Sequence, residues 1–215
     1  MKRTFRFNFS IAASLLAAFA IWTIAICRID LQAIGPRNSV VGFATINGFI
    51  HNLTGANMSL YHITDWLGLV PVAFGFGFAI LGLCQWIKRK HILKVDLSIL
   101  ILGAFYLVVL GAYLFFEAYI INYRPVLIAG YLECSYPSST TLLVMTVMPT
   151  AILQLRSRIH NKFLQNSVSI LLAAFTVFMI AGRLVSGVHW ITDIIGSALL
   201  SSGLVMLYHS FVSLK

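Results

Sequence analysis

Six apolar runs, separated by more polar segments, dominate the pattern of hydrophobic and polar positions along this chain. They cover approximately Ile11–Cys27, Trp66–Ile87, Leu97–Tyr119, Thr140–Leu155, Ser167–Val185 and His189–Tyr208. About 20 apolar residues is the length that an α-helix needs to cross the hydrocarbon core of a bilayer. A helix also satisfies its own backbone hydrogen bonds in lipid. The pattern therefore predicts an all-α polytopic membrane protein with six transmembrane helices in one bundle.

The composition supports a single membrane domain. Of 215 residues, 60% are hydrophobic and 10% are charged, whereas soluble domains carry about 25% charged residues. No polar stretch is long enough to build a soluble domain, so we expect one domain over residues 1–215, with a motif-bearing core at about 97–211. The first run is long for the core of a secretory signal, and it is interpreted as a retained span.

The basic residues predict how the chain is oriented. Eleven of the fifteen lysines and arginines fall at one set of span ends: Lys2, Arg3, Arg6, Lys88, Arg89, Lys90, Lys94, Arg156, Arg158, Lys162 and Lys215. The opposite ends carry Arg28, Arg37, Arg124 and Arg183. Because cytoplasmic loops are enriched in positive charge, both termini are predicted in the cytoplasm. The loops around Arg124 and Arg183 then face the periplasm or the cell exterior.

The net charge of +9 is explained by these short basic clusters, so nucleic acid is not an expected partner. The three cysteines have no regular spacing, which argues against a disulfide framework or a zinc site. We expect no metal, no cofactor and no obligate protein partner.

The chemistry-bearing residues gather between the last two apolar runs, in the stretch GRLVSGVHWITDIIG (182–196). His189 and Asp193 are four residues apart, so on one helix they share a face. The carboxylate then accepts a proton from one imidazole nitrogen and leaves the other as a free lone pair. Gly187 allows a turn, so Arg183 is expected to end the fifth span and His189 to start the sixth. Each residue alone fits an interfacial polar group; their joint placement favours a functional site.

A second polar stretch, NYRPVLIAGYLECSYPSSTT (122–141), precedes the fourth span. Arg124 stands before a proline, and Ser138 and Ser139 lead into the helix. Hydroxyl groups and free backbone N–H groups at a helix start suit an anion. Two arginines, a serine-rich helix start and an oriented histidine on one membrane face predict a phosphate site.

These residues resemble the three motifs of the type 2 phosphatidic acid phosphatase superfamily. Arg183, His189 and Asp193 match its third motif in spacing, Arg124-Pro125 resembles the end of its first motif, and Pro137–Thr140 resembles its second. The resemblance implies that His189 attacks a phosphoryl group and forms a phosphohistidine, while Asp193 orients it. The phosphate oxygens would be held by Arg124, Ser138, Ser139 and Arg183, and no metal would be needed.

Two positions depart from the family pattern. Glu117 stands where the first motif begins with lysine, and Thr140 stands where the second motif ends in the histidine that protonates the leaving group. Loss of general acid catalysis typically costs about 10²–10⁴ in rate. Another residue then has to supply the proton, with Glu133 the first candidate besides Thr140 and with Tyr123 and Tyr131 nearby, or the substrate is a diphosphate with a better leaving group.

Three functions follow from this resemblance. The first is a lipid phosphatase acting on a lipid phosphate or prenyl diphosphate at the outer leaflet of a plasma membrane. The second is a phosphoryl or head-group transferase that uses the same intermediate. The third is a non-catalytic binder or transporter of lipid phosphates. A eukaryotic internal membrane would keep the same topology, with the site facing the lumen.

Overall fold

Eight α-helices and two short 3-10 helices make up most of residues 2–213, the part of the chain that the computed structural model describes. The α-helices are α1 (Lys2–Ile26), α2 (Ala44–Thr54), α3 (Met58–Leu67), α4 (Leu69–Arg89), α5 (Leu97–Ala118), α6 (Ser139–Arg156), α7 (Lys162–Val185) and α8 (Ile191–Val212). The 3-10 helices are η1 (Pro36–Asn38) and η2 (Ile92–Lys94). Extended backbone in this part of the chain occurs as isolated bridges. The predicted all-α class is therefore confirmed.

Five helical segments are long and apolar enough to cross a membrane: Thr4–Ile26, Met58–Arg89, Leu97–Ala118, Lys162–Val185 and Ile191–Val212. The chain is thus an integral membrane protein. The second segment joins α3 to α4 and begins at Met58, whereas the apolar run had predicted a start near Trp66. The segment between the first two apolar runs (residues 28–65, here called the first loop) therefore extends this span by about two helical turns.

The fourth predicted span corresponds to α6, which is not among these five segments, so the six-span count stays a prediction. α6 has 18 residues and packs against α4, α5, α7 and α8. Its buried residues include Thr141, Thr146, Thr150 and Gln154. Thr146 and Thr150 donate hydrogen bonds to carbonyls four residues earlier, at 2.8 Å each. A helix surrounded by protein does not need the apolar surface that lipid demands, which explains its lower hydropathy.

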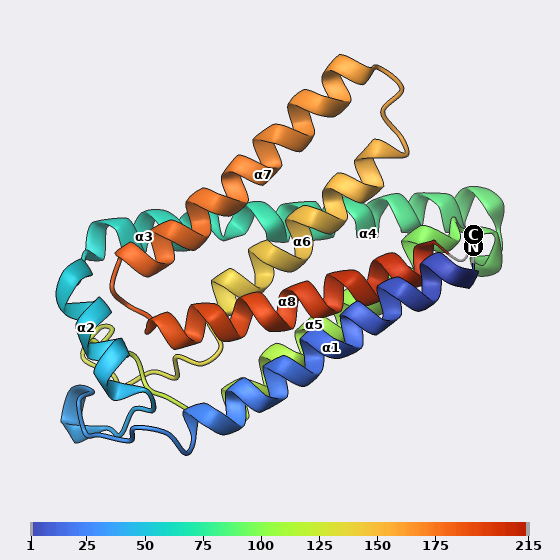
Figure 1. The fold of residues 1–215 in the computed structure, drawn as a ribbon. Helices are drawn as coiled ribbons and strands as arrows, with labels where there is room; N and C mark the ends of the chain where they lie inside the picture. The colour runs from blue at the N-terminus through green and yellow to red at the C-terminus, as the bar shows by residue number, and fades with distance from the viewer. Residues whose placement is uncertain (1, 214–215) are drawn as a thin grey trace.

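The two described chain ends lie together at one end of the bundle (Figure 1). α1 runs along α8 in the opposite direction, so the start of α1 meets the end of α8. We call this the terminal end. The other end, the distal end, holds α2, the start of α3 and the loop of residues 119–138 (Figure 1). Lys215, one of the basic residues predicted at the terminal end, lies outside the described residues.

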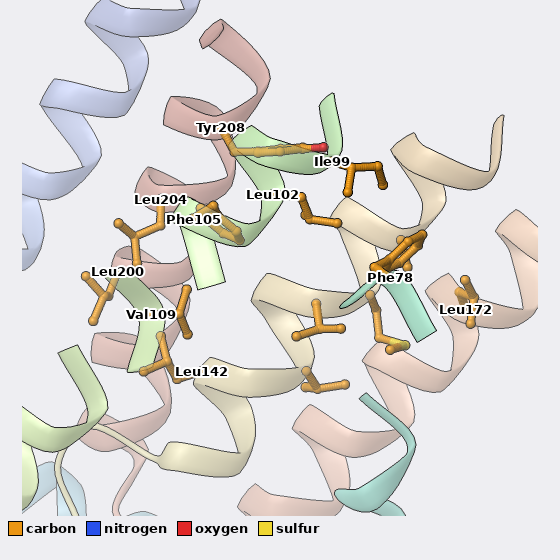
Figure 2. Close-up of a cluster of buried hydrophobic side chains, with 14 of the residues drawn as sticks. Phe78, Ile99, Leu102, Phe105, Val109, Leu142, Leu172, Leu200, Leu204 and Tyr208 are labelled. Atoms are coloured by element: carbon orange, nitrogen blue, oxygen red, sulfur yellow. The ribbon is translucent and has the colours of Figure 1, made fainter. Parts of the chain in front are cut away.

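The apolar core lies between α5, α6 and α8, with Phe78 of α4 and Leu172 of α7 at its border (Figure 2). Leu102, Leu142 and Tyr208 are each at most 2% exposed. These contacts fix the relative positions of α6 and α8, whose first turns meet at the distal end. The core therefore holds in place the two helix starts that carry the polar residues described next.

Candidate active site

The distal end brings together segments that are far apart in sequence. Arg183 lies in the last turn of α7, and Asp193 lies in the first turn of α8. Between them Gly187 has a positive φ of 66°, and a Cβ placed there would lie 1.7 Å from the carbonyl oxygen of Gly55. This position therefore requires glycine both for its backbone conformation and for its close approach to the first loop. The expected turn between the last two spans is present.

His189 is 4% exposed, and its Nδ1 atom lies among hydrogen-bond acceptors. Nδ1 is 3.1 Å from Oγ of Ser135 and 3.1 Å from the Ser135 carbonyl oxygen. The Ser135 hydroxyl in turn donates to Oδ2 of Asp193. Since the hydroxyl proton is directed to the carboxylate, we assign the imidazole proton to Nδ1. The lone pair of His189 is then on Nε2.

Nε2 of His189 faces the second polar stretch, where Nη1 of Arg124 lies 3.5 Å away. The pKa of His189 is lowered to about 4, mainly by burial and to a smaller extent by the charge of Arg124. The imidazole is therefore neutral near pH 7. A neutral imidazole whose Nε2 lone pair faces a guanidinium is suited to attack an anionic phosphoryl group that the guanidinium attracts.

Asp193 acts on His189 through Ser135, and this differs from the predicted direct contact. Oδ2 of Asp193 is 3.7 Å from Nδ1 of His189, beyond hydrogen-bond distance. His189 also precedes α8, whose N-cap is Trp190, so the two residues do not share a helical face. Oδ2 instead accepts from the backbone N–H of Trp190 at 2.8 Å. The carboxylate thus caps the helix and anchors the serine that holds the imidazole.

Replacing Ser135 with alanine is expected to lower kcat about tenfold to a hundredfold, because leaving a buried polar group without its partner costs about 1–3 kcal/mol. The Ser135 carbonyl remains, so the imidazole keeps its tautomer and KM should change little. Steady-state phosphate release measures this effect. The control is Ser210→Ala, which removes a buried hydroxyl from α8, away from the pocket. Equal rates for the two variants would contradict the role of Ser135.

Arg183 is 2% exposed, and only some of the N–H groups of its guanidinium have hydrogen-bond partners. Its Nη2 donates to Oδ1 of Asp65 at 2.9 Å and to the hydroxyl of Thr140. Its Nε and Nη1 atoms have no hydrogen-bond partner within residues 2–213. Buried charged donors without partners are costly in a folded protein. Such a pair of donors is typical of a site completed by an anionic ligand.

The two arginines lie around one aromatic ring that the sequence did not single out. The guanidinium carbon of Arg183 is 5.1 Å from the ring centroid of Tyr61, and that of Arg124 is 5.9 Å from it. Both distances fall within the range of cation–π contacts. Tyr61 and Asp65 are one helical turn apart on α3. Tyr61 lies between the first two apolar runs of the sequence, and nothing there indicated which segment it would contact.

The other predicted site residues are placed in different ways. Ser138 is fully buried and caps α6, with its Oγ 3.4 Å from the backbone nitrogen of Thr141. Ser139 lines the pocket that contains His189. Thr140 contacts Arg183 and is not part of the lining of that pocket. Glu133 pairs with Arg124 at 3.1 Å between Oε2 and Nε. Tyr131 is 73% exposed. The structure thus places His189, Arg124 and Ser139 in the lining of one pocket, whereas Ser138 caps α6.

Two neighbouring cavities, which share lining residues, open near these residues. The smaller is a pocket lined by His189 together with Tyr113, Phe116, Glu117, Arg124, Cys134, Ser135, Tyr136, Pro137, Ser139 and Leu142. The larger is an apolar groove of about 670 Å³ between α4, α5 and α6. Tyr113, Ser139 and Leu142 line both, and Asp65 and Thr140 line the groove. A polar pocket therefore adjoins an apolar groove within the bundle.

No three His, Cys, Asp or Glu side chains within residues 2–213 come close enough together to hold a metal ion.

Fold and geometry thus define a helical membrane protein. One end of its bundle holds a buried histidine, two arginines and a serine that links the histidine to a carboxylate. The family model described as "PAP2 superfamily" matches residues 97–215, and the chain belongs to this superfamily. This confirms the resemblance drawn from the three motifs. No curated protein matches the chain.

Among solved structures, the chain is similar to a protein described as the first transmembrane PAP2 type phosphatidylglycerolphosphate phosphatase from Bacillus subtilis. The two are 21% identical, with a TM-score of 0.46, and the alignment covers 98% of this chain and 94% of that chain.

Proposed function

We propose that the chain is a lipid phosphatase that removes phosphate from a lipid phosphate or a prenyl diphosphate through a phosphohistidine on His189. The observation that carries this proposal is the buried, neutral imidazole, which Ser135 holds at Nδ1 while Nε2 lies beside Arg124. Membership of the PAP2 superfamily supports the same reaction class. The reaction needs no metal in this proposal, because the arginines supply the positive charge.

The adjoining groove supports a lipid as the substrate. Its lining from α4, α5 and α6 is almost entirely apolar, and its polar border carries Asp65 and Thr140 close to Arg183. A phosphate placed between Arg183 and Arg124 would leave its lipid tail in the groove. The distal end is proposed to face the periplasm or exterior of a plasma membrane, because most basic residues belong to the opposite end.

A second candidate function is binding of lipid phosphate without hydrolysis. It is favoured by Thr140, whose hydroxyl is held by Arg183 and cannot replace a histidine as the acid. Both arginines are also paired with carboxylates, Arg124 with Glu133 and Arg183 with Asp65. A binder, however, does not require an imidazole whose Nδ1 is held by a carboxylate-anchored serine.

Phosphate release by the purified protein in lipid nanodiscs, without added metal, tests the proposal. The panel contains phosphatidic acid, phosphatidylglycerol phosphate and a polyprenyl diphosphate, and lipid binding is measured in parallel. Release of phosphate from one of them supports the phosphatase. Binding without release would support the binder, and consumption of the donor lipid that depends on an added acceptor alcohol would support a transferase.

The pH dependence of the reaction follows from the burial of His189. Its pKa is lowered to about 4, so the nucleophile is lost only as the pH falls through that value. We expect kcat/KM, divided by the fraction of substrate in its dianionic form, to stay level from neutral pH down to about pH 5. A corrected profile that already declines near the ordinary histidine pKa of about 6.5 would contradict this environment of His189.

A further inference from the structure

The pocket at His189 contains a carboxylate that the family pattern does not include. Glu117 lies in the last turn of α5 and lines this pocket together with His189, Arg124 and Ser139. One of its oxygens, Oε2, accepts a hydrogen bond from the Cys134 thiol at 3.0 Å. Within residues 2–213 it forms no ion pair with a lysine or arginine, in contrast to Glu133 and Asp65. The Glu117 side chain is exposed, so its carboxylate can accept a proton from water and return it to solvent.

The other polar groups that line the pocket are poor bases. Arg124 has no acceptor capacity. Burial raises the pKa of Cys134 to about 12, so its thiol stays protonated and donates to Glu117. The hydroxyl of Tyr136 is buried and lies 2.7 Å from that of Thr23, and Tyr113 presents a neutral phenol. Apart from His189 itself, Glu117 is thus the one strong proton acceptor in the described lining.

We propose that Glu117 is the general base of the second half-reaction, in which water hydrolyses the phosphohistidine. This inference rests on the proposed phosphatase function. The Cys134 thiol donates to Oε2, and the Tyr113 hydroxyl also lies against the carboxylate. The remaining lone pairs of Glu117 can accept a proton from water.

Groups in the pocket and one water molecule account for every proton and electron pair of the hydrolysis step. The oxygen of the water bonds to phosphorus while one of its protons passes to the carboxylate of Glu117. The bond between phosphorus and Nε2 breaks, and its electron pair returns to the imidazole. Inorganic phosphate leaves, and the Glu117 carboxylic acid returns its proton to solvent. A glutamate at this position thereby supplies the base that the absent second-motif histidine would otherwise provide.

The test separates the two half-reactions in Glu117→Gln. With a labelled lipid phosphate that the wild type hydrolyses, we expect a burst of about one equivalent of dephosphorylated lipid per enzyme. Phosphate release should then slow by about 10²–10⁴, the usual contribution of general acid–base catalysis. Acid-labile label on His189 should accumulate, detected after rapid quenching by mass spectrometry. Glu117→Asp, which keeps the carboxylate, should restore part of the phosphate release.

Asp96→Asn is the matched control, because Asp96 lies at the terminal end, where it pairs with Arg89. It should release phosphate at the wild-type rate without a burst. The inference is overturned if Glu117→Gln shows wild-type phosphate release, or if it slows both half-reactions together without phosphoenzyme. If the wild type itself hydrolyses no lipid, the proposed function fails, and that result is distinct from a failure of Glu117 alone.

Discussion

Replacing His189 with glutamine is expected to reduce phosphate release to the background rate, a loss of roughly 10⁴-fold or more for a nucleophile. Glutamine is close to histidine in volume and can still donate to the Ser135 acceptors, so the buried position tolerates it. It offers no nitrogen lone pair that can attack phosphorus. Lipid binding should persist, because Arg124 and Arg183 are unchanged. The measurements are phosphate release at saturating substrate and the labelling of the protein by a radioactive lipid phosphate.

The matched control for this variant is His209→Gln, in α8, the helix that follows His189. His209 lies at the terminal end, where Nδ1 is 3.0 Å from Nδ2 of Asn8, far along α8 from the pocket. It should retain both phosphate release and labelling. If His189→Gln still formed a covalent phosphoenzyme, another residue would be the nucleophile, and the assignment of His189 would be wrong.

The local motifs were predictable because their chemistry is contained in short stretches. The spacing of Arg183, His189 and Asp193 and the glycine between them were sufficient to place a turn between two helices and polar groups at its two sides. The hydropathy pattern was likewise sufficient for the helices that face lipid. It was least informative for α6, because a helix packed against four others exposes little surface and can carry buried threonines.

The contacts between distant segments were not predictable from the sequence. Ser135 lies in an irregular loop without periodicity, so nothing indicated that its hydroxyl would stand between His189 and Asp193. Tyr61 and Asp65 were read as part of the first loop, yet they belong to a helix that begins at Met58 and reaches Arg183. Glu117 was recognised as a departure from the family pattern, but only the folded chain shows that it lines the pocket of His189.

These distant contacts bear on how the proposed phosphate site would work. Each arginine has a carboxylate partner, and the two partners come from different segments, the loop of residues 119–138 and α3. Asp65 has a side chain that is 56% exposed, whereas that of Arg183 is 2% exposed. In the proposed phosphatase, a substrate phosphate would replace Asp65 at low cost, since the released carboxylate is already largely exposed. Arg183 itself remains fixed by burial.

Replacing Arg183 with methionine is expected to abolish phosphate release while leaving the fold at least as stable as the wild type. Methionine fills a similar apolar volume and removes the desolvation cost of a buried charge. The carboxylate left without a partner, Asp65, is 56% exposed, so the penalty of about 3–5 kcal/mol for breaking a fully buried ion pair does not apply. The loss of activity follows because two unpartnered donors, Nε and Nη1, disappear from the site. Arg183→Lys should be nearly as inactive, since one ammonium group cannot reproduce the planar fork. Phosphate release and the thermal unfolding midpoint in detergent measure the two effects separately.

Arg156→Met provides the comparison, because Arg156 is an exposed arginine that donates to Ser169 near the terminal end of the bundle. It should leave phosphate release intact. If Arg183 only completed the packing between α3, α6 and α7, Arg183→Met would lower the unfolding midpoint and activity in parallel. An inactive variant with an unchanged or raised midpoint would separate the two roles. It would show that the buried guanidinium is retained at a cost in stability, as expected for a charge whose role is to bind phosphate.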